Sequence, residues 1–192
     1  MINKSLTFIK DQLNEHIKKK FGLTQDKVQL SGIVKQDGKQ DPEFVYDSIS
    51  IMLINVQEEP AIQSPTKYLR TEDSDFSTIN PDMNLNLGIL IAVNFNVYAE
   101  ALKFLTAVIG FFQSKNVFSA ENSPGFDLEG INKIRVKFIS QTQEQQNHLW
   151  GSLGAKYMPS VLYKVRLLKI QENQIREKIP QITTINRDYM HS

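Results

Sequence analysis

The residues that most invite a chemical interpretation lie in the segment LWGSLGAKY, residues 149–157, which combines two glycines, a lysine and the chain's single tryptophan. Glycines followed by Lys156 resemble a loop that holds phosphate. Such a loop leads from a strand into a helix, keeps four residues between its glycines and has Ser or Thr after the lysine. Here two residues separate the glycines, and the pattern predicts a helix ending near Trp150 before a strand that begins after Pro159. We therefore expect no nucleotide site and no cofactor.

The same segment is better interpreted as a corner between a helix and a strand. Gly151 and Gly154 are expected to end the helix and turn the chain, because glycine adopts positive φ without strain. Trp150 would then be anchored in the core beneath the corner. Lys156 and Tyr157 would be presented to a neighbouring molecule.

Other residue types that carry catalysis or bind metals are scattered. His16, His148 and His191 stand at no spacing typical of metal ligands, and no serine or threonine is paired with a histidine in a recognisable motif. The chain has no cysteine, which excludes disulfides, thiolate nucleophiles and thiolate metal sites. We therefore expect a protein that is not an enzyme and holds no metal.

Composition narrows the class further. A chain of 192 residues with 41% hydrophobic residues suits one folded domain with an extension. Its formal net charge of +1 provides no overall field for nucleic acid or anionic membranes. Polar and charged residues interrupt the most apolar run, 85–112, so no segment is expected to cross a membrane. The expectation is a soluble protein.

Hydrophobic periodicity predicts two long helices. The first covers about the first twenty residues and stops at Gly22; its apolar stripe consists of Ile2, Leu6, Ile9, Leu13 and Ile17. The second runs from Tyr98 to Ser114 and is apolar around most of its circumference. Such a helix is either the central core helix or also faces a partner, and both interpretations stay open.

Four segments have the pattern of strands. The run 48–56 becomes apolar on both faces at Met52, as in a central strand, and 85–95 alternates throughout. The run 133–139 should direct Phe138 inward, together with Ile134 and Val136, and 161–170 follows a short helix at about 143–149. The predicted fold class is α+β: a mixed, mostly antiparallel sheet packed against the long N-terminal helix and the central apolar helix.

Two segments lack a clear pattern. Residues 57–83 are polar and without periodicity, and a solvated insertion and a subunit-contact arm are both open interpretations. The tail, 171–192, alternates weakly around Ile175, Ile179 and Ile182 and is expected to be an extended arm that stays mobile or adds to a sheet edge. The predicted division is therefore one domain, 1–170, and a C-terminal arm, 171–192.

One electrostatic pattern stands out. Arg135 and Lys137 occupy alternate positions of one predicted strand, and Lys164 and Arg166 occupy alternate positions of another. If the two strands pair, the four side chains form a basic patch on one sheet face. The patch is either an ordinary solvated face or a contact for an acidic partner surface.

Several stretches together resemble a known family. They are LSGIVKQDG (30–38), SISIMLINVQEE (48–59), MNLNLGILIAVNF (83–95), YAEALKFLTAVIGFFQ (98–113) and NHLWGSLGAKYMPSVLYKVRLLKI (147–170). Their succession resembles the tail-terminator or cap proteins of phage-tail-like extracellular contractile injection systems, of the antifeeding-prophage and virulence-cassette type. LWGSLGAKYMPSVLYKVR is the most specific motif, and the similarity covers the chain from the first helix to about Ile170.

What the resemblance implies is structural. The resemblance implies subunits that form a hexameric ring at the distal end of the tube and sheath. Such a ring ends polymerisation and joins the sheath to the tube. The implied partners are copies of the chain itself, the sheath protein, the inner tube protein and a second cap or adaptor protein, with no nucleic acid and no membrane insertion. The implied location is a particle assembled in the bacterial cytoplasm and released outside the cell. The alternative from the residues alone is a monomeric α+β module whose basic sheet face binds an acidic ligand or protein.

Overall fold

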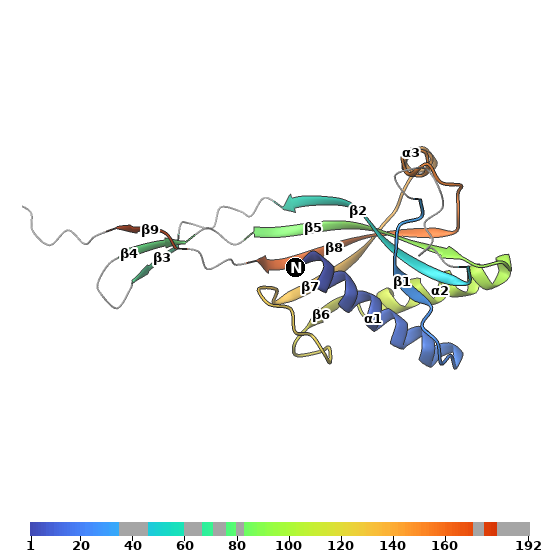
Figure 1. Cartoon of the computed structure of the whole chain (residues 1–192), viewed down its shortest axis with the longest axis horizontal. Helices are drawn as coiled ribbons and strands as arrows, with labels where there is room; N and C mark the ends of the chain where they lie inside the picture. Colours follow the sequence, from blue (N-terminus) through green and yellow to red (C-terminus); the bar gives the residue numbers. More distant parts are fainter. Residues whose placement is uncertain (35–45, 60–66, 71–75, 80–82, 171–174, 180–192) are drawn as a thin grey trace, which may run out of the picture.

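The computed structural model describes residues 1–34, 46–59, 67–70, 76–79, 83–170 and 175–179. Three helices and nine strands lie within these ranges (Figure 1). In chain order they are α1 (Ile2–Phe21), β1 (Val28–Leu30), β2 (Ser48–Glu59), β3 (Lys67–Arg70), β4 (Phe76–Ile79), β5 (Met83–Asn94), α2 (Tyr98–Ser114), β6 (Val117–Ser119), β7 (Lys133–Ile139), α3 (Gln143–Leu153), β8 (Ser160–Ile170) and β9 (Ile175–Ile179).

The main sheet has six strands in the order β1-β2-β5-β8-β7-β6. Only the β1–β2 pair within it is parallel, and the other neighbours are antiparallel. Helices α1 and α2 pack on one face, which we call the helix face, and α3 lies on the opposite face (Figure 1). The predicted α+β class, with a mixed and mostly antiparallel sheet, is confirmed.

The apolar stripe of α1 supplies the first layer of the core. Ile9, Leu13 and Ile17 are completely buried, and the helix ends where Gly22 adopts a φ of 64°. The second helix has the predicted bounds, and its residues Phe104, Val108 and Phe111 are among those buried against the sheet. Both long helices were therefore predictable from the spacing of their apolar residues.

Strand β5 is buried on both faces. Its alternating residues Leu87, Ile89 and Ile91 lie in the core under α1 and α2. Leu90 and Ala92 point the other way, where they pack in a second cluster under α3. Alternation of this kind is typical of a strand with one buried face, and α3 covers the other face because the chain returns over it after β7.

Strand β2 corrects the expectation of a central strand. Neighbours flank it on both sides only over Ile49–Ile51, where β1 pairs with it. The apolar residues on both faces of β2 have two other causes. Met52 and Ile54 pack against the apolar cluster under α3, which we call the α3 cluster. In addition, a β-bulge interrupts the register between Leu53 and Asn55. The bulge inserts one residue, so the strand changes the phase of its alternation at this point.

Phe138 corrects a second expectation. Ile134 and Val136 are buried as predicted, whereas the Phe138 side chain is 47% exposed. It lies on the helix face, because it is paired with Tyr163 of β8. The helices do not cover this position, and a groove remains between α2 and β7.

A small second sheet of three strands has the order β3-β4-β9, and Figure 1 shows it beyond the ends of β2, β5 and β8, away from the helices. The expectation that 57–83 lacks regular structure is wrong for β3, β4 and the continuation of β2 to Glu59. Strand β9 comes from the C-terminal tail and pairs antiparallel with β4 of the same chain. The division into a domain, 1–170, and an arm, 171–192, stays a prediction.

Asn14 joins α1 to the first strand. Its side chain is buried; Oδ1 accepts hydrogen bonds from the backbone N–H groups of Lys27 and Val28, at 3.0 and 2.9 Å, and Nδ2 donates to the Val28 carbonyl at 3.0 Å. These bonds satisfy backbone groups next to the strand and fix how the helix approaches the sheet edge. A buried polar group that loses its partner costs about 1–3 kcal/mol.

We predict that Asn14→Ala lowers the free energy of unfolding by roughly 2–4 kcal/mol, because three hydrogen bonds to partly or fully buried groups are lost together. Chemical denaturation measures the change. The matched control is Asn147→Ala on the exposed surface of α3, which should change stability by less than about 0.5 kcal/mol. Equal effects of the two substitutions would contradict the role assigned to Asn14.

Candidate interaction surfaces

The described part of the chain contains no group of three or more His, Cys, Asp or Glu side chains that could hold a metal ion. None of the helices in that part is long and apolar enough to pass through a membrane. The features that could bind another molecule are instead a charged sheet face, a groove and two sheet edges.

The four basic residues singled out from the sequence share one sheet face. Strands β7 and β8 pair so that Arg135 lies opposite Arg166, and Lys137 lies opposite Lys164. We call these four residues the basic strip. The face is the one opposite α1 and α2, at the end of the sheet that lies away from the α3 cluster. Whether the basic strip binds a partner stays a prediction.

An ion pair holds one member of the basic strip. Like charges directly opposite each other destabilise an antiparallel pair, so the strip favours an acidic neighbour. Glu59 of β2 provides one: its Oε2 lies 2.5 Å from Nε of Arg166, with both side chains about one third exposed. The contact is ionic rather than a well-aligned hydrogen bond, since neither atom has a hydrogen-bond partner of good geometry. It connects β2 to β8 across β5.

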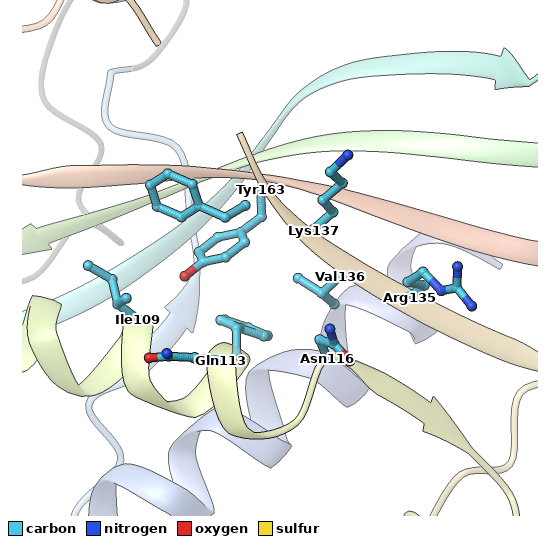
Figure 2. A pocket seen from close by; sticks show the side chains of 9 residues that line it. Ile109, Gln113, Asn116, Arg135, Val136, Lys137 and Tyr163 are labelled. Atoms are coloured by element: carbon cyan, nitrogen blue, oxygen red, sulfur yellow. The ribbon is translucent and has the colours of Figure 1, made fainter. Parts of the chain in front are cut away.

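A groove of about 690 Å³ runs between α2 and β7. Val136, Phe112 and Tyr163 form its apolar floor, and Phe138 and Ile109 stand exposed at its rim. Figure 2 shows Ile109 and Gln113 of α2 on one side of it, and Val136 and Tyr163 of the sheet on the other. We call it the α2–β7 groove. Its lining combines aromatic surface with a few polar side chains, a composition typical of binding sites.

Tyr163 lies in the floor of the α2–β7 groove. Its ring is 4.7 Å from that of Phe112 and 5.6 Å from that of Phe138, measured between ring centroids. Figure 2 shows its hydroxyl directed towards α2. Burial raises the pKa of the Tyr163 phenol to about 12, because the charged phenolate would lose its hydration.

We predict that this tyrosine makes the fold sensitive to alkali. The unfolded chain has the ordinary pKa of 10.0, so the contribution of Tyr163 is fully present below pH 10 and is lost as the pH rises towards about 12. The loss is on the order of 2 kcal/mol by pH about 12. Measuring the free energy of unfolding against pH should show a shallower alkaline decline for Tyr163→Phe than for the unchanged chain. Identical slopes would contradict the assignment.

The corner at the end of α3 partly matches its prediction. Trp150 is buried in the cluster under α3, as predicted, and Gly154 ends the helix with a φ of 64°. The expectation for Gly151 is wrong, because the helix continues through it to Leu153. A capping box between Thr142 and Gln145 starts the helix, and its last turn needs only one glycine with positive φ.

The other residues of the corner are accessible or structural. Tyr157 is 61% exposed, with its ring 5.7 Å from that of Trp150, and Lys156 is exposed beside it. The carbonyl of Pro159 accepts a hydrogen bond from the backbone N–H of Val93 at 3.0 Å, which attaches the corner to the end of β5. A contact of Lys156 and Tyr157 with a neighbour stays a prediction.

The tail residues proposed as contacts lie in or beyond the small sheet. Ile175 and Ile179 are the first and last residues of β9, paired with Ile79 and Phe76 of β4. Ile182 lies outside the described residues. Their role in contacting a sheath stays a prediction.

Sequence reasoning missed the open edges of the main sheet. The bulge in β2 and the short pairings of β1 and β6 decide which backbone groups remain available, and neither follows from hydrophobic periodicity. One signal was present. The break in the alternation of 51–54, interpreted as a central strand, is also the pattern that a bulge with a second covered face produces.

The described residues fold as an α+β subunit with a mixed, mostly antiparallel main sheet. Two solved structures are similar to it. One is a sheath/tube terminator of an extracellular contractile injection system, PVC, in the extended state, with 14% identity, a TM-score of 0.57, and coverage of 94% of this chain and 63% of that one. The other is the tube terminating cap of the anti-feeding prophage, with 11% identity, a TM-score of 0.55, and coverage of 93% and 60%.

The family follows from the sequence itself. The family model described as the Pvc16 N-terminal domain matches residues 6–184, and the chain therefore belongs to this family. The chain spans about six tenths of the length of the two solved chains it matches. No curated protein matches it.

Proposed function

We propose that the chain is a structural cap or cap-adaptor subunit of a contractile injection system. Six copies form a ring at the distal end of the tube and sheath, as the resemblance of its sequence implies. The observation that carries the proposal is the match to the Pvc16 N-terminal domain over residues 6–184. It is supported by a fold shared over nearly the whole chain with a sheath/tube terminator and a tube terminating cap. In this role the ring ends polymerisation and joins the sheath to the tube.

A cap must bind the last layer of a polymer without presenting the surface that the next layer would bind. The chain has separate surfaces for such tasks: the main sheet with its helices, and the three-stranded sheet beyond its ends. We assign ring and tube contacts to the main sheet. We assign the sheath contact to the small sheet, because short strands outside a compact body suit strand addition by an extended partner.

Loss of the chain should change the length of the particles. In bacteria that assemble the injection system, deleting the coding sequence should give tubes and sheaths of irregular or excessive length, or particles that do not assemble stably, because nothing stops polymerisation. Electron microscopy of purified particles measures the length distribution. Restoring the chain from a plasmid is the control, and particles of normal, uniform length without it would reject the proposal.

Removing the C-terminal arm should separate ring formation from sheath attachment. The main sheet ends at Ile170, so deleting 171–188 should leave it folded while sheath is no longer retained at the cap. Glu177→Pro, which removes a backbone donor in the middle of β9, should weaken retention in the same direction, whereas Glu177→Ala should not. Co-purification of sheath protein with the cap reports the effect, and unchanged retention in the deletion would refute this assignment.

The basic strip favours a second candidate, a monomeric module that binds an acidic ligand. Two pairs of like charges face each other on its strands, and among the described residues Glu59 is the acidic side chain paired with it. Mass measurement of the purified chain in solution separates the candidates. Rings support the cap, and a strict monomer at high concentration favours the module.

A further inference from the structure

We propose that the open edge of β2 in one copy pairs with the open edge of β7 in the next copy, so that the main sheet continues from subunit to subunit. The proposal rests on the ring in the proposed function and identifies its contact. The partner of this interaction surface is a second copy of this chain. Four observations support it: the edges, their apolar residues, their directions and their charges.

The main sheet has an open edge on each side. Strand β1 pairs with β2 only over Ile49–Ile51, and no described strand lies along the outer side of β2 from Leu53 to Glu59. On the other side, β6 pairs with β7 only over Lys133–Arg135. The Asn116 carbonyl accepts from Val136 N–H at 2.8 Å, and from Lys137 to Ile139 the described part of the chain supplies no neighbouring strand.

Both open edges carry exposed apolar side chains. Leu53 and Val56 on β2 are 37% and 44% exposed, and Phe138 on β7 is 47% exposed. The bulge matters here, because it places Leu53 opposite Ile89 and Val56 opposite Leu87, so that both point to the helix face. Exposed edges of soluble proteins are usually protected by charges, prolines or covering segments. Apolar residues on an open edge therefore indicate a surface that is covered in an assembly.

The directions of the strands allow the pairing. Each strand from β2 through β5 and β8 to β7 is antiparallel to its neighbour, so β2 and β7 run in opposite directions. A copy related by rotation about an axis along the strands keeps these directions, and β2 would meet β7 as an antiparallel neighbour. Both helix faces would then lie on the same side. Strand β6 and Asn116 cover β7 as far as Val136, so the end of β2 meets Lys137 and Phe138, and Val56 and Glu58 approach the rim of the α2–β7 groove.

The open edges lie at opposite ends of the sheet, which implies a stagger. Glu59 is paired with Asn84 at one end of β5, whereas Ile139 lies beside Leu162 near the other end. Pairing the two edges therefore shifts each copy along the strands relative to the last. A sheet that closes on itself needs tilted strands and such a stagger in register.

Charges favour this head-to-tail contact over pairing of identical edges. The open part of β2 ends in Glu58 and Glu59, and the open part of β7 begins with Lys137, whereas Arg135 is paired with β6. An antiparallel β7–β7 pair would bring basic residues together, and a β2–β2 pair would bring acidic ones together, whereas β2 with β7 combines opposite charges. A contact between two different patches propagates and closes into a ring when the rotation permits.

Disulfide trapping tests the contact, because the chain has no cysteine that could give a background. We expect Val56→Cys/Phe138→Cys, oxidised as the purified full chain, to form a ladder of species larger than dimers on a non-reducing gel. Each single cysteine variant can form dimers at most. The matched control is Val56→Cys/Ser152→Cys, which pairs the β2 edge with an exposed position on α3. A ladder no stronger than this control in the test pair would overturn the proposal and leave the edges to a different occupant, such as a sheath or tube segment.

A mixing experiment provides a test without disulfides. Val56→Asp and Phe138→Asp should each abolish self-association, and both change exposed side chains, so their thermal unfolding should stay close to that of the unchanged chain. Because each variant retains one intact edge, an equal mixture should form heterodimers but no rings in native mass spectrometry. Undiminished rings in either folded variant would overturn the proposal. The outcome of these tests is independent of the particle-length experiment. If disulfide trapping fails but particles from the deletion strain have abnormal lengths, only the β2–β7 contact is rejected. If trapping succeeds but those particles have normal lengths, only the cap role is rejected.

Discussion

Burial of β5 on both faces is the interaction on which the rest of the structure depends. One face lies under α1 and α2 through residues such as Ile89 and Ile91, and the other lies under α3 through Leu90 and Ala92. Each fully buried leucine or isoleucine side chain contributes about 1.5–3 kcal/mol. The strand also pairs with β2 and β8 along most of its length. It therefore positions β2, which has the open edge, and β8, which carries half of the basic strip.

The bulge in β2 connects this core to the surfaces. Without the extra residue, Asn55, Gln57 and Glu59 would point to the helix face, and Val56 would point away from it. With it, Glu59 reaches Arg166 on the basic strip, while Val56 joins Leu53 on the helix face. Gly88 lies opposite the bulge, where an added Cβ would come within 3.3 Å of the Cβ of Asn55. One local irregularity thus determines the chemistry on both sides of the outer strand.

Much of the fold could be predicted from periodicity. The stripe of α1, the bounds of α2 and the alternation of β5 are properties of segments in which side chains repeat on one face, and each was confirmed. The failures share a cause. Phe138 has the alternation of a buried residue but lies beyond the cover of the helices, and Gly151 has the residue type of a helix end but lies one turn before it. Burial and helix length depend on neighbouring elements, which a local pattern does not contain.

The sequence by itself determined the two long helices and the long strands β2, β5, β7 and β8, that Trp150 is anchored in the core, and that the four basic residues share a face once β7 and β8 pair. It also determined the family, because motifs distributed along the chain carry that signal. Only the tertiary structure decided that β1 and β6 are too short to cover the sheet edges, that the bulge directs Val56 to the helix face, and that β9 pairs with a hairpin nearly a hundred residues earlier in the chain. The physical reason is that strand pairing and register depend on contacts between distant segments, whereas helix formation and alternation depend on residues close together in the chain.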